Sequence, residues 1–328
     1  MTSTHMPKVA FSRGRIEIAG RDMTMAVLLV AAVIVLAVAA APLTGGVFYS
    51  PNNVTNLMRQ MTTTGLLALG MLFVVLTGGI DLSVGSVVAF AAIFAAGSSL
   101  RWGLPIWLCL LLGVATGVVW GLVNGTLVAR FDLAPFVVTL ATMTTIRGLT
   151  FVYSDVPIQP KDPGFVALGA STAGPVPVTT AIMVAFFLLG AVFLNRTPLG
   201  RSAIAIGGNR ETVRLAGISV ARGIIATYVI SGLCAGTAGV LLASRLGNVQ
   251  PSLGQAFELD AIAACVIGGA SLAGGRGTIR GTVMGVLVLA VMNNILSLRN
   301  VDTYWQSVFK GLIIIVVIMI HSRSRQRG

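Results

Sequence analysis

Residues 104–129 read LPIWLCLLLGVATGVVWGLVNGTLVA, and none of these 26 residues is charged. A helix that crosses a bilayer needs about 20 mostly apolar residues, so this stretch is long enough to span a membrane. The whole chain has the same character. Of its 328 residues, 55% are hydrophobic and 10% are charged, whereas a soluble domain has about 25% charged residues. The sequence therefore predicts an integral membrane protein.

Nine other segments share this apolar character, which predicts an all-α polytopic protein with about ten membrane-spanning helices. The first half should contain helices at 24–42, 60–78, 83–100, 104–129 and 133–153. The second half should contain helices at 177–195, 223–245, 258–275, 279–298 and 303–321. Near residues 79–100 and 258–275 the segments are short and rich in small residues, so broken, short or re-entrant helices are expected there. The expected domains are a tail at 1–23, a transmembrane domain at 24–321 and a tail at 322–328.

If the chain crosses the membrane ten times, its Lys and Arg residues are distributed unequally between the two sides of the membrane. The side with both termini carries 15 of the 22 basic residues, the other side carries five, and Arg147 and Lys310 fall within spans. Basic loops remain on the cytoplasmic side of a membrane. Both termini are therefore expected in the cytoplasm, and the net charge of +12 reflects membrane orientation rather than nucleic-acid binding.

The two halves of the chain, about 24–153 and 177–321, carry similar motifs. Asp81 opens the third span and Asp260 opens the eighth, while Asn124 and Asn293-Asn294 lie near the ends of the fourth and ninth. Because each half has five spans, matching helices would cross the membrane in opposite directions. Inverted repeats of this kind are common in transporters, with the pathway between the halves. A chance resemblance between apolar segments is the alternative.

Glycines four residues apart recur within three of the expected spans. They are Gly113, Gly117 and Gly121, then Gly232 and Gly236, and finally Gly281 and Gly285. Such spacing lets helices approach closely in lipid. We interpret these glycines as packing seams rather than as a pathway.

Several classes of enzyme are excluded by what the chain lacks. Its two histidines, His5 and His321, lie near opposite ends and form no metal-site or Ser–His pattern with other residues. None of the three lysines follows a glycine, so the phosphate-binding loop G-x-x-x-x-G-K-[ST] is absent. We therefore expect no catalytic site, no bound cofactor and no metal in this chain. Its cysteines, Cys109, Cys234 and Cys265, each lie in an apolar run and are expected to be buried.

The segment 196–222 is the longest loop on the cytoplasmic side and carries five arginines. Asn209 is expected to cap a short helix with Glu211 in its first turn and Gly217 at its end. The apolar surface of this segment should consist of Val213, Leu215, Ala216 and Ile218. Either a partner protein or anionic lipid headgroups could bind such a surface.

Polar residues within or beside apolar spans are candidates for solute contact or for bonds between helices. These candidates are Asp81, Ser83, Asn124, Arg147, Glu258, Asp260, Asn293, Asn294 and Lys310. Asp81 and Asp260 could instead cap helices, and Arg147 and Lys310 could extend to the membrane interface. The residues alone leave these alternatives open and identify no solute.

From about residue 50 to residue 320, the chain resembles the permeases of ribose-type ABC importers, a family with xylose, arabinose, galactose, autoinducer-2 and nucleoside permeases. The resemblance rests on separated signatures in a fixed order. They are TGGIDLSVGS at 77–86, TPLGR at 197–201 with GGN at 207–209 and RLAGI at 214–218, ELDAIAA at 258–264 with GGASLAGG at 268–275, and Asn293-Asn294. Ala270 departs from the pattern, because a hydroxyl residue is expected there.

The resemblance implies a permease subunit for a ribose-type monosaccharide in a bacterial inner membrane, paired with a second copy or a paralogue. It also implies an ATPase subunit that uses ATP and Mg²⁺ on the cytoplasmic side, and a periplasmic sugar-binding protein. The loop that couples the permease to the ATPase would comprise Thr197, Pro198, Leu199, Gly200, Arg201, Gly207, Gly208, Asn209, Glu211, Arg214, Leu215, Gly217 and Ile218. ATP-driven movement of this loop would open the pathway alternately to each side.

Other solutes remain open within the same class of importer, namely autoinducer-2, a nucleoside or a branched-chain amino acid. An ion-coupled secondary transporter is less favoured, because such proteins usually place acidic residues deep within a span. Here the acidic residues lie near the ends of spans.

Overall fold

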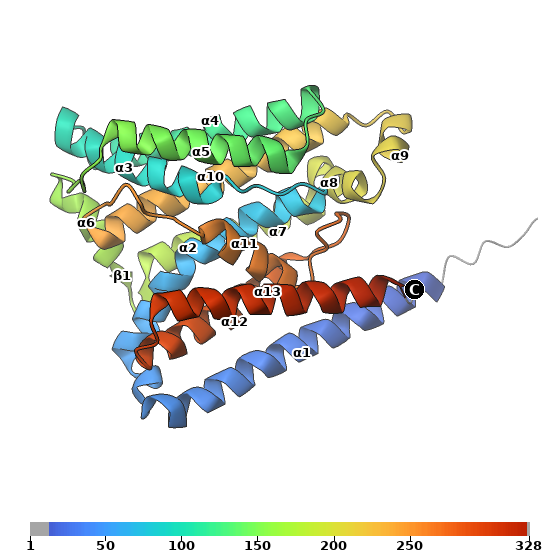
Figure 1. Cartoon of the computed structure of the whole chain (residues 1–328), viewed down its shortest axis with the longest axis horizontal. Helices are drawn as coiled ribbons and strands as arrows, with labels where there is room; N and C mark the ends of the chain where they lie inside the picture. The colour runs from blue at the N-terminus through green and yellow to red at the C-terminus, as the bar shows by residue number, and fades with distance from the viewer. Residues whose placement is uncertain (1–12, 327–328) are drawn as a thin grey trace, which may run out of the picture.

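The computed structural model describes residues 13–326, and this part of the chain is almost entirely helical (Figure 1). Its first helices are α1 (Arg13–Thr44), η1 (Val47–Tyr49), α2 (Pro51–Leu76), α3 (Val84–Trp102), α4 (Ile106–Arg130), α5 (Pro135–Tyr153) and α6 (Pro163–Ala170). They are followed by α7 (Val178–Arg196), α8 (Pro198–Gly208), α9 (Arg210–Leu215), α10 (Val220–Leu246), α11 (Phe257–Ile267), α12 (Ile279–Leu298) and α13 (Thr303–Gln326). The strands β1 (Thr172–Ala173) and β2 (Val176–Pro177) form one short antiparallel pair. The predicted all-α class is confirmed.

Seven of the described helices are long and apolar enough to cross a membrane, namely α2, α3, α4, α5, α7, α10 and α12. Helices α1 and α13 coincide with the first and tenth expected spans. The protein is therefore a multi-pass membrane protein. The three cysteines are buried free thiols, as the sequence predicts.

The two segments expected to be broken or short differ from each other. Helix α3 is continuous over 19 residues, and the irregular backbone near it is confined to residues 77–83. Helix α11 has 11 residues, which is about 16 Å at 1.5 Å per residue and half the thickness of a membrane core. The short helix expected near residues 258–275 is thus confirmed, whereas α3 is unbroken within the expected stretch 79–100.

The terminal helices extend beyond the apolar stretches that predicted them. Residues 13–23 continue α1 and residues 322–326 continue α13, although both segments were expected to be tails. A helix need not end at the membrane surface, because its hydrogen bonds are made within the backbone. The remaining tail residues, 1–12 and 327–328, lie outside the described part of the chain.

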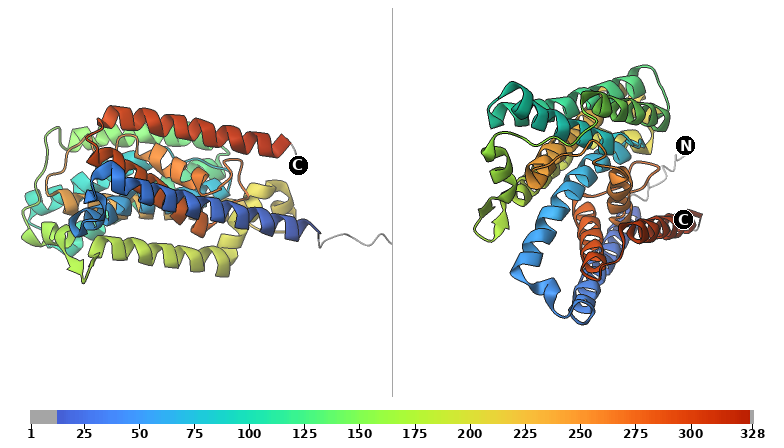
Figure 2. Two further views of the ribbon diagram at one scale, coloured as in Figure 1. Left: turned by 90° about the horizontal axis from the view of Figure 1, so that it is seen from below. Right: turned by 60° about the vertical axis from the view of Figure 1, so that its left-hand side comes forward.

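The packing of the helices repeats between the two halves. Helix α10 packs on α3 and α4, and α2 packs in the same way on α11 and α12. Likewise α3 contacts α4 and α5, while α11 contacts α12 and α13. Figures 1 and 2 show that matching helices run in opposite directions. The second to fifth spans thus have inverted counterparts, whereas α1 packs on α12 and α7 on α2 without matching contacts.

Glycines allow the central helices to touch backbone to backbone. A Cβ atom at Gly117 of α4 would lie 2.8 Å from the Cα of Gly236 of α10, and one at Gly285 of α12 would lie 3.0 Å from the nitrogen of Gly268. A Cβ at Gly285 would also lie 2.9 Å from the carbonyl carbon of Ala264. Real Cβ atoms essentially never come within 3.0 Å of backbone atoms, so only glycine fits at these positions. The predicted packing seams are confirmed, and they leave no space for a solute between α4 and α10.

Candidate functional site

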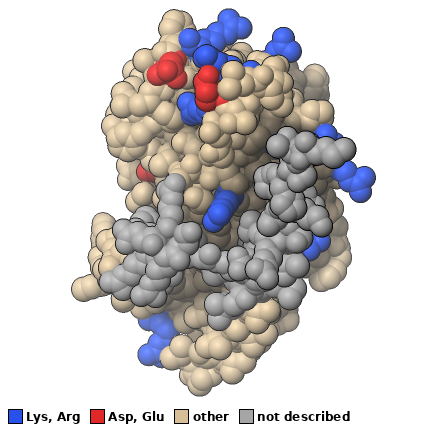
Figure 3. Space-filling view, turned by 90° about the vertical axis from the view of Figure 1, so that its right-hand side faces the viewer, with Lys and Arg blue, Asp and Glu red and all other residues tan. Residues whose placement is uncertain are grey.

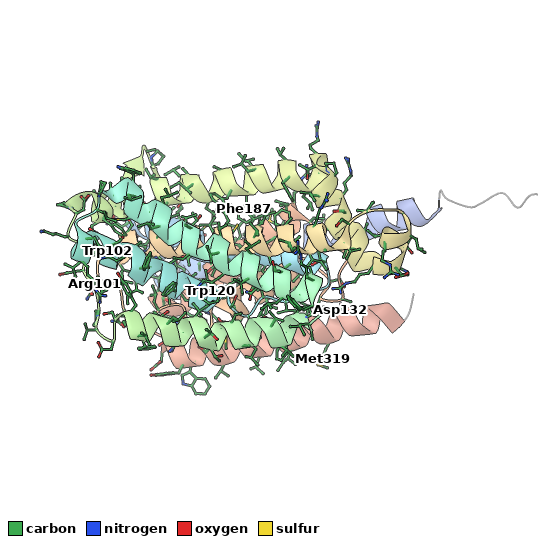
Figure 4. The ribbon with its side chains drawn as sticks, turned by 90° about the horizontal axis from the view of Figure 1, so that it is seen from above. Arg101, Trp102, Trp120, Asp132, Phe187 and Met319 are labelled. Carbon is green, nitrogen blue, oxygen red and sulfur yellow. The ribbon has the colours of Figure 1, made fainter. Side chains whose placement is uncertain are left out.

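Irregular segments gather at the end of the bundle where α8 and α9 lie, which we call the α8 end (Figure 1). There the amide of Gly275 donates to Leu76 O at 3.0 Å, and Thr139 Oγ1 donates to Ile80 O at 3.1 Å. Figure 4 shows Asp132 toward this end, with Arg101 and Trp102 at the opposite end. We call that opposite end, which contains α6, the α6 end.

Two short helices form most of the loop 196–222. Thr197 Oγ1 accepts the amide of Gly200 at 3.0 Å and caps α8, with Pro198 in its first turn. Asn209 Oδ1 accepts the amide of Thr212 at 2.9 Å and caps α9, as predicted. Sequence reasoning missed α8, although a capping Thr followed by Pro is a common helix start.

The apolar residues of α9 divide between the core and the surface. Val213 is buried against Ile206 and Tyr228, which fixes α9 to the bundle. Leu215 is 80% exposed and Ile218 is 46% exposed. In Figure 3, which views the α8 end, basic side chains gather at the upper edge with acidic side chains among them. The loop therefore presents an exposed surface that is both apolar and basic.

Asp81 belongs to a buried network of hydrogen bonds. Its Oδ1 accepts the amide and hydroxyl of Ser83 at 3.0 and 2.6 Å, and its Oδ2 accepts Ser231 Oγ at 2.9 Å. Asn124 Nδ2 donates to Ser83 Oγ at 2.9 Å. Because Asp81 is only 2% exposed, the network ties the segment 77–83 to α4 and α10. Sequence reasoning missed Ser231, which lies in an ordinary apolar helix.

Asn294 makes a reciprocal amide pair with Asn53. Each side-chain nitrogen donates to the other side-chain oxygen, at 2.9 and 3.0 Å, and both residues are buried. The neighbouring Asn293 has a buried Oδ1 atom that lacks a hydrogen-bond partner among the described residues. Asn294 thus links α12 to α2, and no sequence signal identified Asn53 as its partner.

Lys310 and Asp260 form an ion pair between α13 and α11. The Nζ atom lies 2.9 Å from Oδ1 and 3.0 Å from Oδ2. This geometry supports the pairing alternative for both residues over helix capping and extension to the membrane interface.

Arg147 and Glu258 meet at a pocket of about 410 Å³ between α3, α5 and the start of α11. The polar residues that line it are Ser86, Thr144, Arg147, Gln255 and Glu258, and Met143 and Ala256 complete the lining. Arg147 Nη1 donates to Leu253 O at 2.6 Å and to Pro251 O at 3.2 Å. The predicted pathway residues are therefore dispersed over separate sites, and two of them line this pocket.

A bundle of apolar helices with inverted packing and a pocket between its halves is typical of membrane transport proteins. The family described as "Branched-chain amino acid transport system / permease component" matches residues 53–318. The chain belongs to this permease family.

Its relatives include sugar permeases of other bacteria. The ribose import permease protein of Bacillus subtilis is 43% identical over 83% of this chain and 85% of its own length. The ribose import permease protein of Escherichia coli is 38% identical over 85% of this chain and 88% of its own length. The xylose transport system permease protein of Escherichia coli is 34% identical over 92% of this chain and 92% of its own length. No solved structure matches the chain.

Proposed function

We propose that this chain is the permease subunit of an ABC importer that carries a monosaccharide across the inner membrane of a bacterium. The observation that carries the proposal is the 43% identity to a ribose import permease, which extends over 83% of the chain. A second ribose permease and a xylose permease support the same class of solute.

The surface of α8 and α9 is the proposed docking site for a separate ATPase subunit, which binds ATP and Mg²⁺. Leu215 and Ile218 are exposed there beside Arg214, which pairs with Glu211 at 3.4 Å. Exposed apolar residues within a basic surface suit a protein partner better than lipid headgroups alone. Both chain termini would then lie on the cytoplasmic side, and the α6 end would face the periplasmic binding protein.

A second permease copy would complete the pathway. Arg147 and Glu258 line a pocket beside an exposed face of α5 that includes Thr144 and Gly148. Charged side chains facing lipid are costly in free energy. A second copy, or a closely related permease, covering this face would replace lipid with protein and a water-filled path.

The docking surface is tested by co-purification and uptake in cells of the source organism. A Cβ at Gly208 would meet no atom within 4 Å, so Gly208→Asp adds charge to the surface without disturbing the fold. We expect Gly208→Asp and Leu215→Glu to lower both ATPase retention and sugar uptake at least tenfold, which corresponds to about 1.4 kcal/mol of docking energy.

The matched control is Val156→Glu, which places the same charge on a residue 60% exposed at the α6 end. This variant should retain the ATPase. If Gly208→Asp and Leu215→Glu retain the ATPase and full uptake, the docking assignment is wrong.

A second solute class is favoured by one observation, since the family description names branched-chain amino acids. Uptake of labelled ribose, xylose and leucine by cells with and without the permease gene separates the alternatives. Sugar uptake that depends on the gene supports the proposal. Leucine uptake alone would replace the monosaccharide with an amino acid.

A further inference from the structure

Ser86 has a buried hydroxyl without a bonding partner. The residue is 1% exposed and lines the pocket between α3, α5 and α11, and among the described residues its Oγ has no hydrogen-bond partner. Buried polar groups are nearly always hydrogen-bonded. On the same helix, Ser98 Oγ donates to Ala95 O at 2.8 Å. The Ser86 hydroxyl thus has bonding capacity to spare, and a molecule in the pocket would reach it once a neighbouring side chain moves aside.

Arg147 supplies donors to the same pocket. A guanidinium carries five N–H donors and no acceptor. Only Nη1 is engaged among the described residues, where it bonds to the carbonyls of Pro251 and Leu253. These bonds hold the segment 247–256 against α5, and they leave Nε and Nη2 for a ligand.

Glu258 supplies acceptors, and a glycine makes room for it. A Cβ atom at Gly85 would lie 2.5 Å from Glu258 Oε2, so a side chain at position 85 would displace the carboxylate from its place beside α3. The ion pairs found in the described structure join Lys310 to Asp260 and Arg214 to Glu211, and neither of them joins Arg147 to Glu258. The two opposite charges of the pocket thus lie near each other without forming a salt bridge.

This combination of groups matches the hydroxyls of an uncharged polyol. Each sugar hydroxyl both donates and accepts, and the pocket offers a donor-only guanidinium, an acceptor-only carboxylate and hydroxyls that do both. One positive and one negative group balance in charge, so a solute with a single net charge would be opposed by one of them, whereas an uncharged polyol or a zwitterion such as leucine would not. A volume of about 410 Å³ lies within the range of about 300–1,000 Å³ for small-molecule sites.

The pocket also lies where the two halves of the protein meet. Helices α3 and α5 belong to the first half and α11 to the second. The loop after α11 contacts α8, because a Cβ at Gly274 would lie 2.9 Å from the Cα of Gly207. This contact joins α8 to the loop that follows α11, and Glu258 lies in the first turn of α11.

We propose that this pocket binds one molecule of the transported sugar, with Ser86, Arg147 and Glu258 contacting its hydroxyl groups. The inference rests on the proposed function and identifies its solute-binding residues within the permease. No single polar group selects a sugar, so the pocket holds the solute weakly during its passage. The external binding protein would still supply most of the affinity.

The first test is Ser86→Ala in the full transporter, with cells of the source organism and labelled ribose and xylose. Removing an unpartnered hydroxyl should leave the amount of folded permease unchanged. If this hydroxyl bonds to the solute, the maximal uptake rate should fall about fivefold, the effect of one hydrogen bond. The matched control is Ser98→Ala, a buried serine of α3 outside the pocket, and it should transport normally.

The second test measures protection by the solute. Thr144 lines the pocket, whereas its exposed neighbour Thr145 does not. Thr144→Cys and Thr145→Cys are each treated with a small thiol reagent during turnover, with and without saturating sugar. Sugar should slow modification at position 144 at least threefold and leave position 145 unchanged.

The outcomes separate the pocket from the proposed function. The pocket assignment is wrong if the wild type takes up sugar, Ser86→Ala takes it up equally well, and sugar gives no protection at position 144. The proposed function as an importer would still stand in that case. Absence of gene-dependent sugar uptake in the wild type would overturn the proposed function and the pocket's ligand together. Protection at position 144 by leucine alone would also overturn the sugar assignment.

Discussion

Gly207 and Gly208 are adjacent in sequence but have opposite surroundings. A Cβ at Gly207 would collide with Leu76 O and the amide nitrogen of Gly275, whereas one at Gly208 would meet nothing within 4 Å. Both groups near Gly207 are backbone atoms, which cannot move aside without shifting α2 or the loop after α11. The family signature contains both glycines, and only the packing distinguishes their roles.

Gly207→Ala should therefore destabilise the permease by about 1–3 kcal/mol, as overpacking does elsewhere. Gly208→Ala should leave stability unchanged. The measurement is thermal unfolding of the purified permease in detergent, monitored by the loss of its monodisperse peak in size-exclusion chromatography. Equal midpoints for the two variants would contradict the close contact at Gly207.

The amide pair of Asn53 and Asn294 allows a second test at this scale. Removing either side chain leaves a buried amide unpaired, so Asn53→Ala and Asn294→Ala should each cost about 1 kcal/mol or more. The double variant should cost less than the sum, because the two residues share their bonds. Simple additivity in the thermal unfolding of the three variants would show that the pair contributes no coupling energy.

At the scale of elements, α11 is too short to be stable without its neighbours. It has only 11 residues, and its ion pair to α13 lies within the bundle at 2.9 Å. Propensity cannot stabilise so short a helix. Its apolar residues Ala261, Ala264 and Val266 are buried in the main core, so packing and the ion pair fix its position.

Breaking the ion pair should therefore loosen α11 and lower transport. Lys310→Met leaves the Asp260 carboxylate unpaired, at a cost of about 3 kcal/mol for a largely buried pair. Combining it with Asp260→Asn removes the isolated charge and should recover much of the stability. Thermal unfolding and sugar uptake are measured for both variants. A double variant no more stable than Lys310→Met would contradict the pairing.

At the scale of the whole molecule, the two ends of the bundle should face different compartments. Arg210 lies exposed in α9 at the α8 end, and Asp155 lies exposed after α5 at the α6 end. With the basic loops inside, a membrane-impermeant thiol reagent should label Asp155→Cys in intact cells. It should label Arg210→Cys only after the membrane is opened. The reverse pattern would invert the proposed orientation.

The apolar runs predicted most helices because a bilayer selects for length and hydrophobicity, which are local properties. The helix α12 matches its predicted bounds, 279–298, and α5 differs only at its start. The helix α2 begins at Pro51 rather than at residue 60. Its first turns are polar, and Ser50 caps them by accepting the amide of Asn53 at 3.3 Å. Hydropathy does not register such a polar extension.

The candidate site was predicted only in part, because composition does not specify partners. Arg147 and Glu258 were among the predicted polar candidates, but Ser86 became significant only when its hydroxyl proved to have no bonding partner among the described residues. Asp81 looked like an equal candidate from sequence. In the structure it is bonded to Ser83 and Ser231, which lies 150 residues away.

The sequence by itself determined that this is a helical membrane protein, which side carries the basic residues, and that its segment 196–222 resembles a coupling loop. These properties follow from local composition, from charge placement and from short motifs. Only the tertiary structure decided which polar residues bond to each other and which remain free around a pocket. Those relations join residues up to 241 positions apart in the chain, and helix packing rather than local sequence brings them into contact.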